Sequence, residues 1–144
     1  MTVIDAYALV AFVADEPAAD EVESLLRTGE CRVNAINLAE AIDVCRRVHG
    51  LLHDDIRGVV EPLTVSNTLG VGVSDEHDAW LAAELRSEHY DRKTCAISIA
   101  DCFAVALAVA EDSAIATADP GMAAVARQEG VPLVALPDRR GKRP

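Results

Sequence analysis

The segment TVIDAYALVAFVA, residues 2–14, lies near the start of the chain and changes from a strand-like to a helix-like pattern of apolar residues. Residues 2–4 form an apolar run typical of a strand. The strand must stop near Asp5, because residues 6–14 favour a helix with apolar side chains on every face. A strand that leads directly into a buried helix predicts helices packed on a sheet, that is, a protein of the α/β class.

Strand-like and helix-like segments alternate along the rest of the chain. Strands are predicted at residues 2–4, 31–36, 69–73, 113–118 and 131–136, and helices at residues 6–14, 18–28, 37–50, 75–88, 97–110 and 120–130. Residues 51–61 are weakly helical, and Pro62 is expected to interrupt them. The alternation predicts a parallel sheet covered by helices on both faces.

The length and composition are those of one domain. The chain has 144 residues, of which 51% are apolar but only 3% aromatic, so the core is expected to consist of Ala, Val, Leu and Ile. We assign residues 1–137 to this domain and residues 138–144 to a basic, disordered tail. The four cysteines include no C-x-x-C pair and are expected to be reduced core thiols.

The net charge of −11 restricts the partners of the protein. It understates the acidity of the body, because the tail is basic. The sequence therefore lacks the broad basic surface of a nonspecific nucleic-acid-binding protein, and a basic protein partner is favoured. No apolar run approaches the ~20 residues needed to span a bilayer, and no secretory segment opens the chain. A cytoplasmic protein that does not engage a membrane is expected.

Four acidic residues stand where predicted strands meet helices. Asp5 ends the first strand and Asp119 follows the fourth. Glu40 lies early in the helix after the second strand, and Asp101 begins the most apolar helix. Because ligands of open parallel sheets bind at the carboxyl ends of the strands, these four acids are the candidate functional residues.

The same acids also have a purely structural explanation. Asn37-x-x-Glu40 and Ser98-x-x-Asp101 are similar to capping boxes, and the other two acids are placed to cap the helices that follow them. At Asp101 a functional role is favoured over capping alone, because its segment AISIADCFAVALAVA (residues 96–110) contains no Lys or Arg to balance a carboxylate. A bound cation would supply the balance, and oxygen-only ligands select Mg²⁺ or Mn²⁺.

Four segments resemble, in order and spacing, the motifs of PIN-domain nucleases. They are VIDAYAL (residues 3–9), NLAE (37–40), SIADCFAVALA (98–108) and ATADPGM (116–122). The resemblance spans residues 1–136 and implies a PIN-like three-layer sandwich with a parallel sheet of about five strands. It also implies an Mg²⁺- or Mn²⁺-dependent endoribonuclease that leaves 5′-phosphate and 3′-hydroxyl ends. The residues that would hold the metal are Asp5, Glu40, Asp101 and Asp119.

Resemblance to small members of the family implies the toxin of a type II toxin–antitoxin pair, of the VapC type. The expected partners are an RNA substrate, a small antitoxin with a basic inhibitory segment, and a second copy of the chain in a homodimer. An arginine of the antitoxin is expected to enter the acidic pocket. Thr117 matches the family threonine two residues before the last acid, where its hydroxyl is expected to orient a carboxylate or a metal-bound water.

Two departures from the family pattern have expected consequences. Tyr7 stands where the family often has a small hydroxyl residue, and is expected to alter the surroundings of the metal or to narrow the pocket. Residues 120–122 supply no further acid or asparagine after Asp119, so a second metal ion is expected to be held poorly.

Two other functions compete with this interpretation. In a phosphatase or phosphotransferase, Asp5 would be the nucleophile, but the D-x-D motif would need an acid where Tyr7 stands. In a catalytically silent binding module, the acids would only cap helices and the acidic surface would bind a basic partner. Measuring thermal stability as Mg²⁺ or Mn²⁺ is added distinguishes the two: a metal site should give a specific stability shift, and acids that only cap helices should not.

Overall fold

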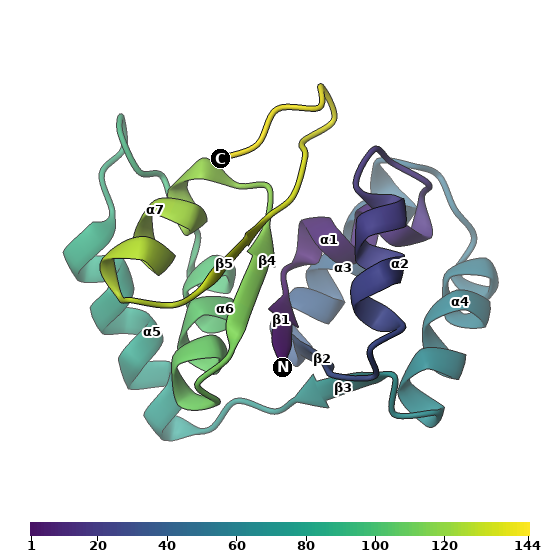
Figure 1. Cartoon of the computed structure of the whole chain (residues 1–144), viewed down its shortest axis with the longest axis horizontal. Coiled ribbons are helices and arrows are strands. Elements are labelled where there is room, and N and C mark those ends of the chain that lie inside the picture. Colours follow the sequence, from purple (N-terminus) through teal and green to yellow (C-terminus); the bar gives the residue numbers. More distant parts are fainter.

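A five-stranded parallel sheet forms the centre of the computed structural model, which describes residues 1–144 (Figure 1). The strands are β1 (Thr2–Ile4), β2 (Cys31–Asn34), β3 (Leu69–Gly72), β4 (Ala114–Thr117) and β5 (Leu133–Ala135). The helices are α1 (Ala6–Val13), α2 (Ala19–Leu26), α3 (Ala35–Arg47), α4 (His53–Val65), α5 (Glu76–His89), α6 (Ile99–Ala110) and α7 (Pro120–Gln128). None of the helices combines the length and the apolar character that a membrane crossing requires.

The strand order is β3-β2-β1-β4-β5, and all four pairings are parallel. The chain first moves outward from β1 through β2 to β3, then returns to the other side of β1 as β4. The direction of winding therefore changes between β1 and β4. Such a switch point is where open parallel sheets bind their ligands.

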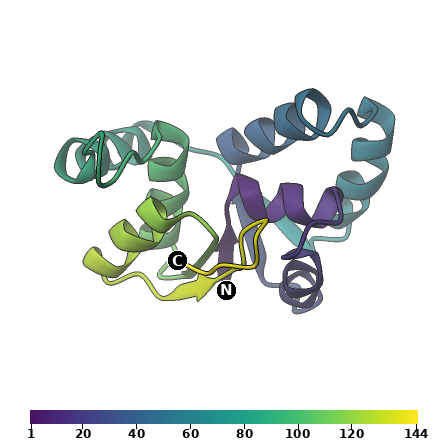
Figure 2. The same cartoon turned by 90° about the horizontal axis from the view of Figure 1, so that it is seen from above.

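The sheet is covered on both faces, as the sequence predicts. Successive strand residues point to opposite faces. Val3 and Ile115 belong to one cluster of buried apolar residues, together with residues of α5, α6 and α7. Ile4 and Ala116 belong to the other cluster, together with residues of α1, α2, α3 and α4. The same division of the helices into two groups is visible in Figures 1 and 2.

Helix α3 begins two residues earlier than the sequence predicts. Asn34 is its N-cap, because the Asn34 side chain accepts a hydrogen bond of 2.9 Å from the Ile36 backbone N–H. Asn37 lies inside the first turn and is completely buried. The predicted capping box between Asn37 and Glu40 is therefore wrong, since an asparagine three residues upstream takes the capping position.

Pro62 does not interrupt α4, which continues to Val65. A proline inside a helix removes one hydrogen bond to the carbonyl four residues earlier. Here that carbonyl belongs to Gly58, which is exposed and open to water. The Pro62 carbonyl still accepts from the Ser66 N–H at 3.0 Å, so the helix resumes after the proline.

Residues 138–144, the predicted tail, are joined to the body of the protein by two ion pairs. Arg139 forms an ion pair of 2.8 Å with Glu16, and Arg143 forms one of 2.6 Å with Glu21. In Figure 1 the tail crosses above the carboxyl ends of the central strands, between α7 and α2. All four cysteines are free, and three of them are buried.

Candidate metal centre

Asp5 and Asp119 follow the two strands at the switch point. Asp5 comes directly after β1 and caps α1, where its Oδ1 accepts a hydrogen bond of 2.7 Å from the Ala8 N–H. Asp119 caps α7 after β4, and its Oδ1 accepts from the Met122 N–H at 2.7 Å. Because β1 and β4 are paired in parallel, the two carboxylates lie at the same edge of the sheet.

Asp5 is the most perturbed acid of the protein. Its side chain is buried, with 2% of its surface exposed, and this burial raises its pKa from 3.8 to about 7. Hydrogen bonds from Thr117 and Ala8 oppose the rise, while the charges of Asp101 and Asp119 add to it. The protein therefore holds a carboxylate where its negative charge is costly.

Asp101 occupies the third position of α6 and completes the capping box that the sequence predicts. Its Oδ2 accepts from the Ser98 N–H at 2.8 Å, and the Ser98 hydroxyl accepts from the Asp101 N–H at 3.0 Å. Burial raises the pKa of Asp101 despite these bonds, and the charge of Asp119 raises it further. The backbone capping bond occupies the Oδ2 atom of Asp101.

Thr117 links Asp5 to Asp119. It is fully buried at the end of β4, and its hydroxyl accepts a hydrogen bond of 2.9 Å from the Asp119 backbone N–H. The Thr117 side chain also lowers the pKa of Asp5, so it lies close to that carboxylate. One side chain thus contacts an acid after each of the two central strands.

Glu40 is exposed on α3 and accepts no hydrogen bond from the protein. Partial burial raises its pKa, and the charge of Asp101 adds to the effect, so Glu40 and Asp101 are within electrostatic range of each other.

Asn37, one helical turn before Glu40, makes a contact in this region that the sequence did not predict. Its side-chain amide donates to the Ala100 carbonyl at 3.1 Å and joins α3 to α6. The feature of the sequence that could have indicated this contact is the polar residue Asn37 on the buried face of α3.

The charge of Asp101 affects the pKa values of Asp5 and Glu40, and that of Asp119 affects those of Asp5 and Asp101, but the four acids do not form one tight cluster. No three of their carboxylates have oxygen atoms that all lie within 4.8 Å of one another. The one group with such spacing lies elsewhere, at the ends of α5 and α7, and consists of Glu88, His89 and Glu129. There His89 Nε2 is already paired with Glu129 at 2.6 Å.

The donor set suits a hard divalent cation. None of the four acids forms an ion pair with a basic side chain, so their charges have no partner in the protein. All four offer carboxylate oxygens, the ligands that Mg²⁺ and Mn²⁺ prefer. Capping and metal binding are compatible, because a carboxylate that caps a helix with one oxygen keeps a second one.

A model of the PIN domain matches residues 2–135. The chain belongs to the PIN-domain family. This confirms the family that the four sequence segments predict. No curated protein matches the sequence.

Several solved structures have a fold similar to that of this chain. The toxin VapC20 of Mycobacterium tuberculosis, described as cleaving the sarcin-ricin loop, has a TM-score of 0.70 at 15% identity over 86% of this chain and 94% of that chain. VapBC2 of Rickettsia felis, solved with a DNA fragment from its promoter, has a TM-score of 0.66 at 16% identity, covering 94% and 98%. FitAcB of Neisseria gonorrhoeae has a TM-score of 0.60 at 23% identity, covering 92% and 96%. These likenesses confirm the PIN-like α/β fold.

Proposed function

We propose that this PIN domain is a metal-dependent endoribonuclease and the toxin of a type II toxin–antitoxin pair. The observation that carries the proposal is Asp5, a buried carboxylate at the end of the central strand with two further acids in electrostatic range and no basic partner. The charged form of such a carboxylate is unfavourable unless a cation compensates it; without one, the group tends to take up a proton. Membership in a family whose nucleases generally use divalent metals supports the same conclusion.

Asp5, Glu40, Asp101 and Asp119 would hold Mg²⁺ or Mn²⁺. A bound ion of this kind lowers the pKa of a water molecule and neutralises charge that develops on a phosphate. The chain itself orients the ligands, since backbone N–H groups fix one oxygen of each aspartate. The hydroxyl of Thr117 accepts a hydrogen bond from the Asp119 N–H and lies beside the Asp5 carboxylate. No acid follows Asp119 within residues 120–122, which favours a single metal ion.

The role of toxin is supported by the fold and by the charge. VapC20, which has this fold, is described as a toxin, and another structure with this fold is described as a toxin–antitoxin complex from Klebsiella pneumoniae. A protein with a net charge of −11 favours a basic partner. We therefore expect a small antitoxin whose basic segment reaches the acids. RNA is the proposed substrate, and hydrolysis of its phosphodiester bonds is the proposed reaction.

The competing function is that of a binding module whose acids serve only as caps. It is favoured by one observation, namely that three of the four acids make capping hydrogen bonds. Capping alone does not explain why Asp5 is buried within electrostatic range of Asp101 and Asp119. The phosphatase alternative gains no support, because Tyr7 stands where its D-x-D motif needs an acid. The Tyr7 hydroxyl donates to the Pro137 carbonyl.

The deciding experiment uses two aspartates in matched capping boxes. Asp101 and Asp78 occupy the same third position of α6 and α5, and each accepts from the N–H of its N-cap residue. The wild type is expected to gain thermal stability with Mn²⁺ and to cleave RNA. Asp101→Asn is expected to lose both effects while remaining folded, and Asp78→Asn to keep both. Cleavage by folded Asp101→Asn would contradict the metal site, and an absent Mn²⁺ shift in the wild type would favour the binding module.

A further inference from the structure

The tail leaves the sheet at the edge that carries the four acids. Strand β5 is parallel to β4, so its carboxyl end opens on the same side as Asp119. The Leu136 N–H donates to the Thr117 carbonyl at 2.9 Å, and the Tyr7 hydroxyl donates to the Pro137 carbonyl at 2.9 Å. Two hydrogen bonds thus fix the start of the tail beside residues of the candidate metal centre.

Residues 138–143, which we name the tail loop, form a compact turn around one carboxylate. Asp138 Oδ1 accepts hydrogen bonds of 2.8 Å from the N–H groups of both Arg140 and Lys142. The Asp138 N–H donates in return to the Lys142 carbonyl at 2.7 Å. Gly141 has a φ of 78°, a left-handed conformation that closes the turn. The local sequence therefore gives the tail loop a defined shape.

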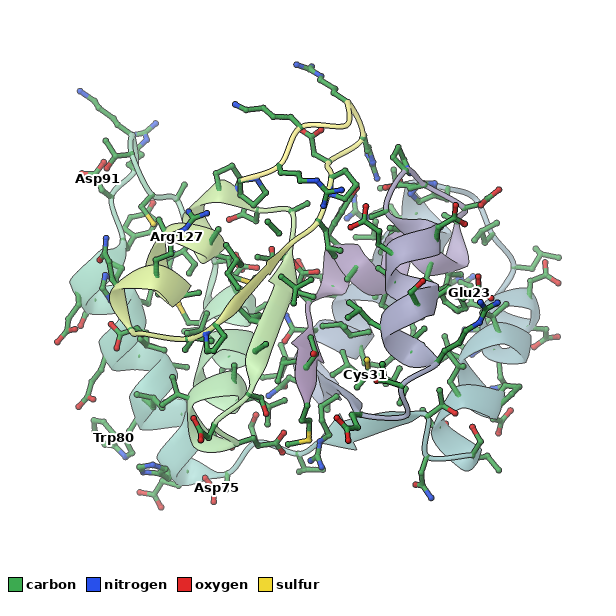
Figure 3. All side chains as sticks on the ribbon, viewed as in Figure 1. Glu23, Cys31, Asp75, Trp80, Asp91 and Arg127 are labelled. Atoms are coloured by element: carbon green, nitrogen blue, oxygen red, sulfur yellow. The ribbon has the colours of Figure 1, made fainter.

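The four cations of the tail loop fall into two pairs. Arg139 and Arg143 are bound to Glu16 and Glu21, which attach the loop to the region of α1 and α2. Arg140 and Lys142 are exposed and form no ion pair. Figure 3 shows nitrogen-tipped side chains extending from the tail into solvent. The outer pair anchors the loop, and the inner pair is free to meet a ligand.

The tail loop borders the candidate metal centre on two sides. A cavity of about 160 Å³ is lined by Lys142 and Arg143 together with Ala118 and Pro120, the neighbours of Asp119. A second cavity of about 200 Å³ is lined by Arg139, Tyr7 and Glu40. The loop therefore extends from the side of Asp119 to the side of Glu40.

We infer that the tail loop is a phosphate-binding element for the RNA substrate, with Arg140 and Lys142 as the contacts. This inference rests on the proposed function. A polyanion approaching a body more acidic than −11 is repelled, and it needs local cations beside the acids to be held there. Guanidinium and ammonium groups are the side chains that bind phosphates. Four of the 13 basic residues lie in the tail loop, at the edge where the scissile phosphate must approach.

The test removes the two free cations and keeps the anchors. The double variant Arg140→Gln/Lys142→Gln is compared with Arg27→Gln/Arg57→Gln, which removes two exposed charges from α4 and the end of α2. Cleavage of a single-stranded RNA is measured with Mn²⁺ over a range of KCl concentrations. We expect the tail variant to raise KM about fivefold or more and to reduce the slope of log(kcat/KM) against log[salt] by about 1.4, since each phosphate contact on a single strand contributes about 0.7. The control variant should retain the KM and slope of the wild type.

Each outcome decides between the inference and the proposed function. If the wild type cleaves RNA and the tail variant has the same KM and salt slope, the phosphate-binding role is overturned and the nuclease stands. Faster cleavage by the tail variant would also overturn it, because the loop would then obstruct the site. If the wild type cleaves no RNA, the proposed function fails, and anisotropy of a fluorescent RNA tests the loop by itself. If the wild type and the tail variant bind the RNA equally, or the wild type does not bind it, the inference is overturned.

Discussion

The side-chain amide of Asn37 donates a hydrogen bond of 3.1 Å to the backbone carbonyl of Ala100, which is 63 residues away in the sequence. This bond joins the first turn of α3 to the first turn of α6. Glu40 follows Asn37 by one helical turn, and Asp101 is the neighbour of Ala100. The contact therefore links the helical turns that carry two of the proposed metal ligands. Asn37 itself is fully buried.

Asn37→Ala is expected to weaken Mn²⁺ binding about tenfold, because residues that orient metal ligands typically contribute this much. The lost buried hydrogen bond should also reduce the free energy of unfolding by about 1 kcal/mol. Metal affinity is measured by calorimetric titration with Mn²⁺. Ser113→Ala, which removes a partly buried hydrogen bond at the opposite edge of the sheet, is the control and should lose stability only. Unchanged Mn²⁺ affinity in Asn37→Ala would show that the bond serves packing alone.

Thr117→Val is expected to reduce RNA cleavage about 10-fold to 100-fold, less than Asp101→Asn does, because Thr117 orients acids without replacing one. It should also cost about 1–3 kcal/mol of stability, since the Asp119 N–H loses its acceptor. Thr117→Ser restores the hydroxyl and should restore both properties. Steady-state cleavage rates and chemical denaturation provide the measurements. An activity loss equal to that of Asp101→Asn would mean that Thr117 acts directly on the metal or the RNA.

The metal-free protein is expected to become more stable on mild acidification. The folded-state pKa of Asp5, about 7, lies above its ordinary value of 3.8. Such a group favours folding below the lower value and progressively loses this contribution as the pH rises through the higher one. The raised pKa values of Glu40 and Asp101 act in the same direction. For Asp5 alone, the free energy of unfolding should be about 2 kcal/mol higher near about pH 5.5 than near about pH 7.5.

Asp5→Asn isolates this effect, because it keeps a cap acceptor for Ala8 and removes the charge. The metal-free variant should be more stable than the wild type near neutral pH and should show a flatter pH dependence. Saturating Mg²⁺ should flatten the dependence of the wild type as well. Glu84→Gln, on the exposed face of α5, is the control and should follow the wild type. A wild type that loses stability throughout mild acidification would identify the acids as independent caps.

The antitoxin is expected to bind through an arginine that contacts the proposed metal ligands. Planar guanidinium groups pair with two carboxylate oxygens at once, so the arginine and Mg²⁺ should compete for the same acids. Affinity for the antitoxin should therefore fall as Mg²⁺ rises at constant ionic strength, and fall less with a monovalent salt. Calorimetry across the Mg²⁺ series provides the measurement. A flat affinity, or no effect of replacing the arginines of the antitoxin by glutamine, would place inhibition away from these acids.

Most of the fold was predictable from the sequence, because the relevant forces act over a few residues. The apolar run before Asp5 ends where the helix pattern begins, and β1 and α1 follow this division. The capping box of Ser98 and Asp101 and the cap by Asp119 were likewise predictable, since a cap and its N–H lie three residues apart. The predicted start of α3 was wrong because Asn34 and Asn37 are equivalent in local chemistry. Only the tertiary structure shows that Asn34 is the N-cap and that the buried Asn37 contacts α6.

By itself, the sequence determined which acids follow which strands, and the matching order of four segments indicated the family. Tertiary structure decided what surrounds them. The strand order places β1 between β2 and β4, which brings Asp5 near Asp119 and Asp101 and buries it enough to raise its pKa to about 7. It also directs the tail loop to the same edge, although residues 138–143 are far from Asp5 in the chain. These features depend on contacts between distant segments, and local patterns carry no information on which distant segments meet when the sheet assembles.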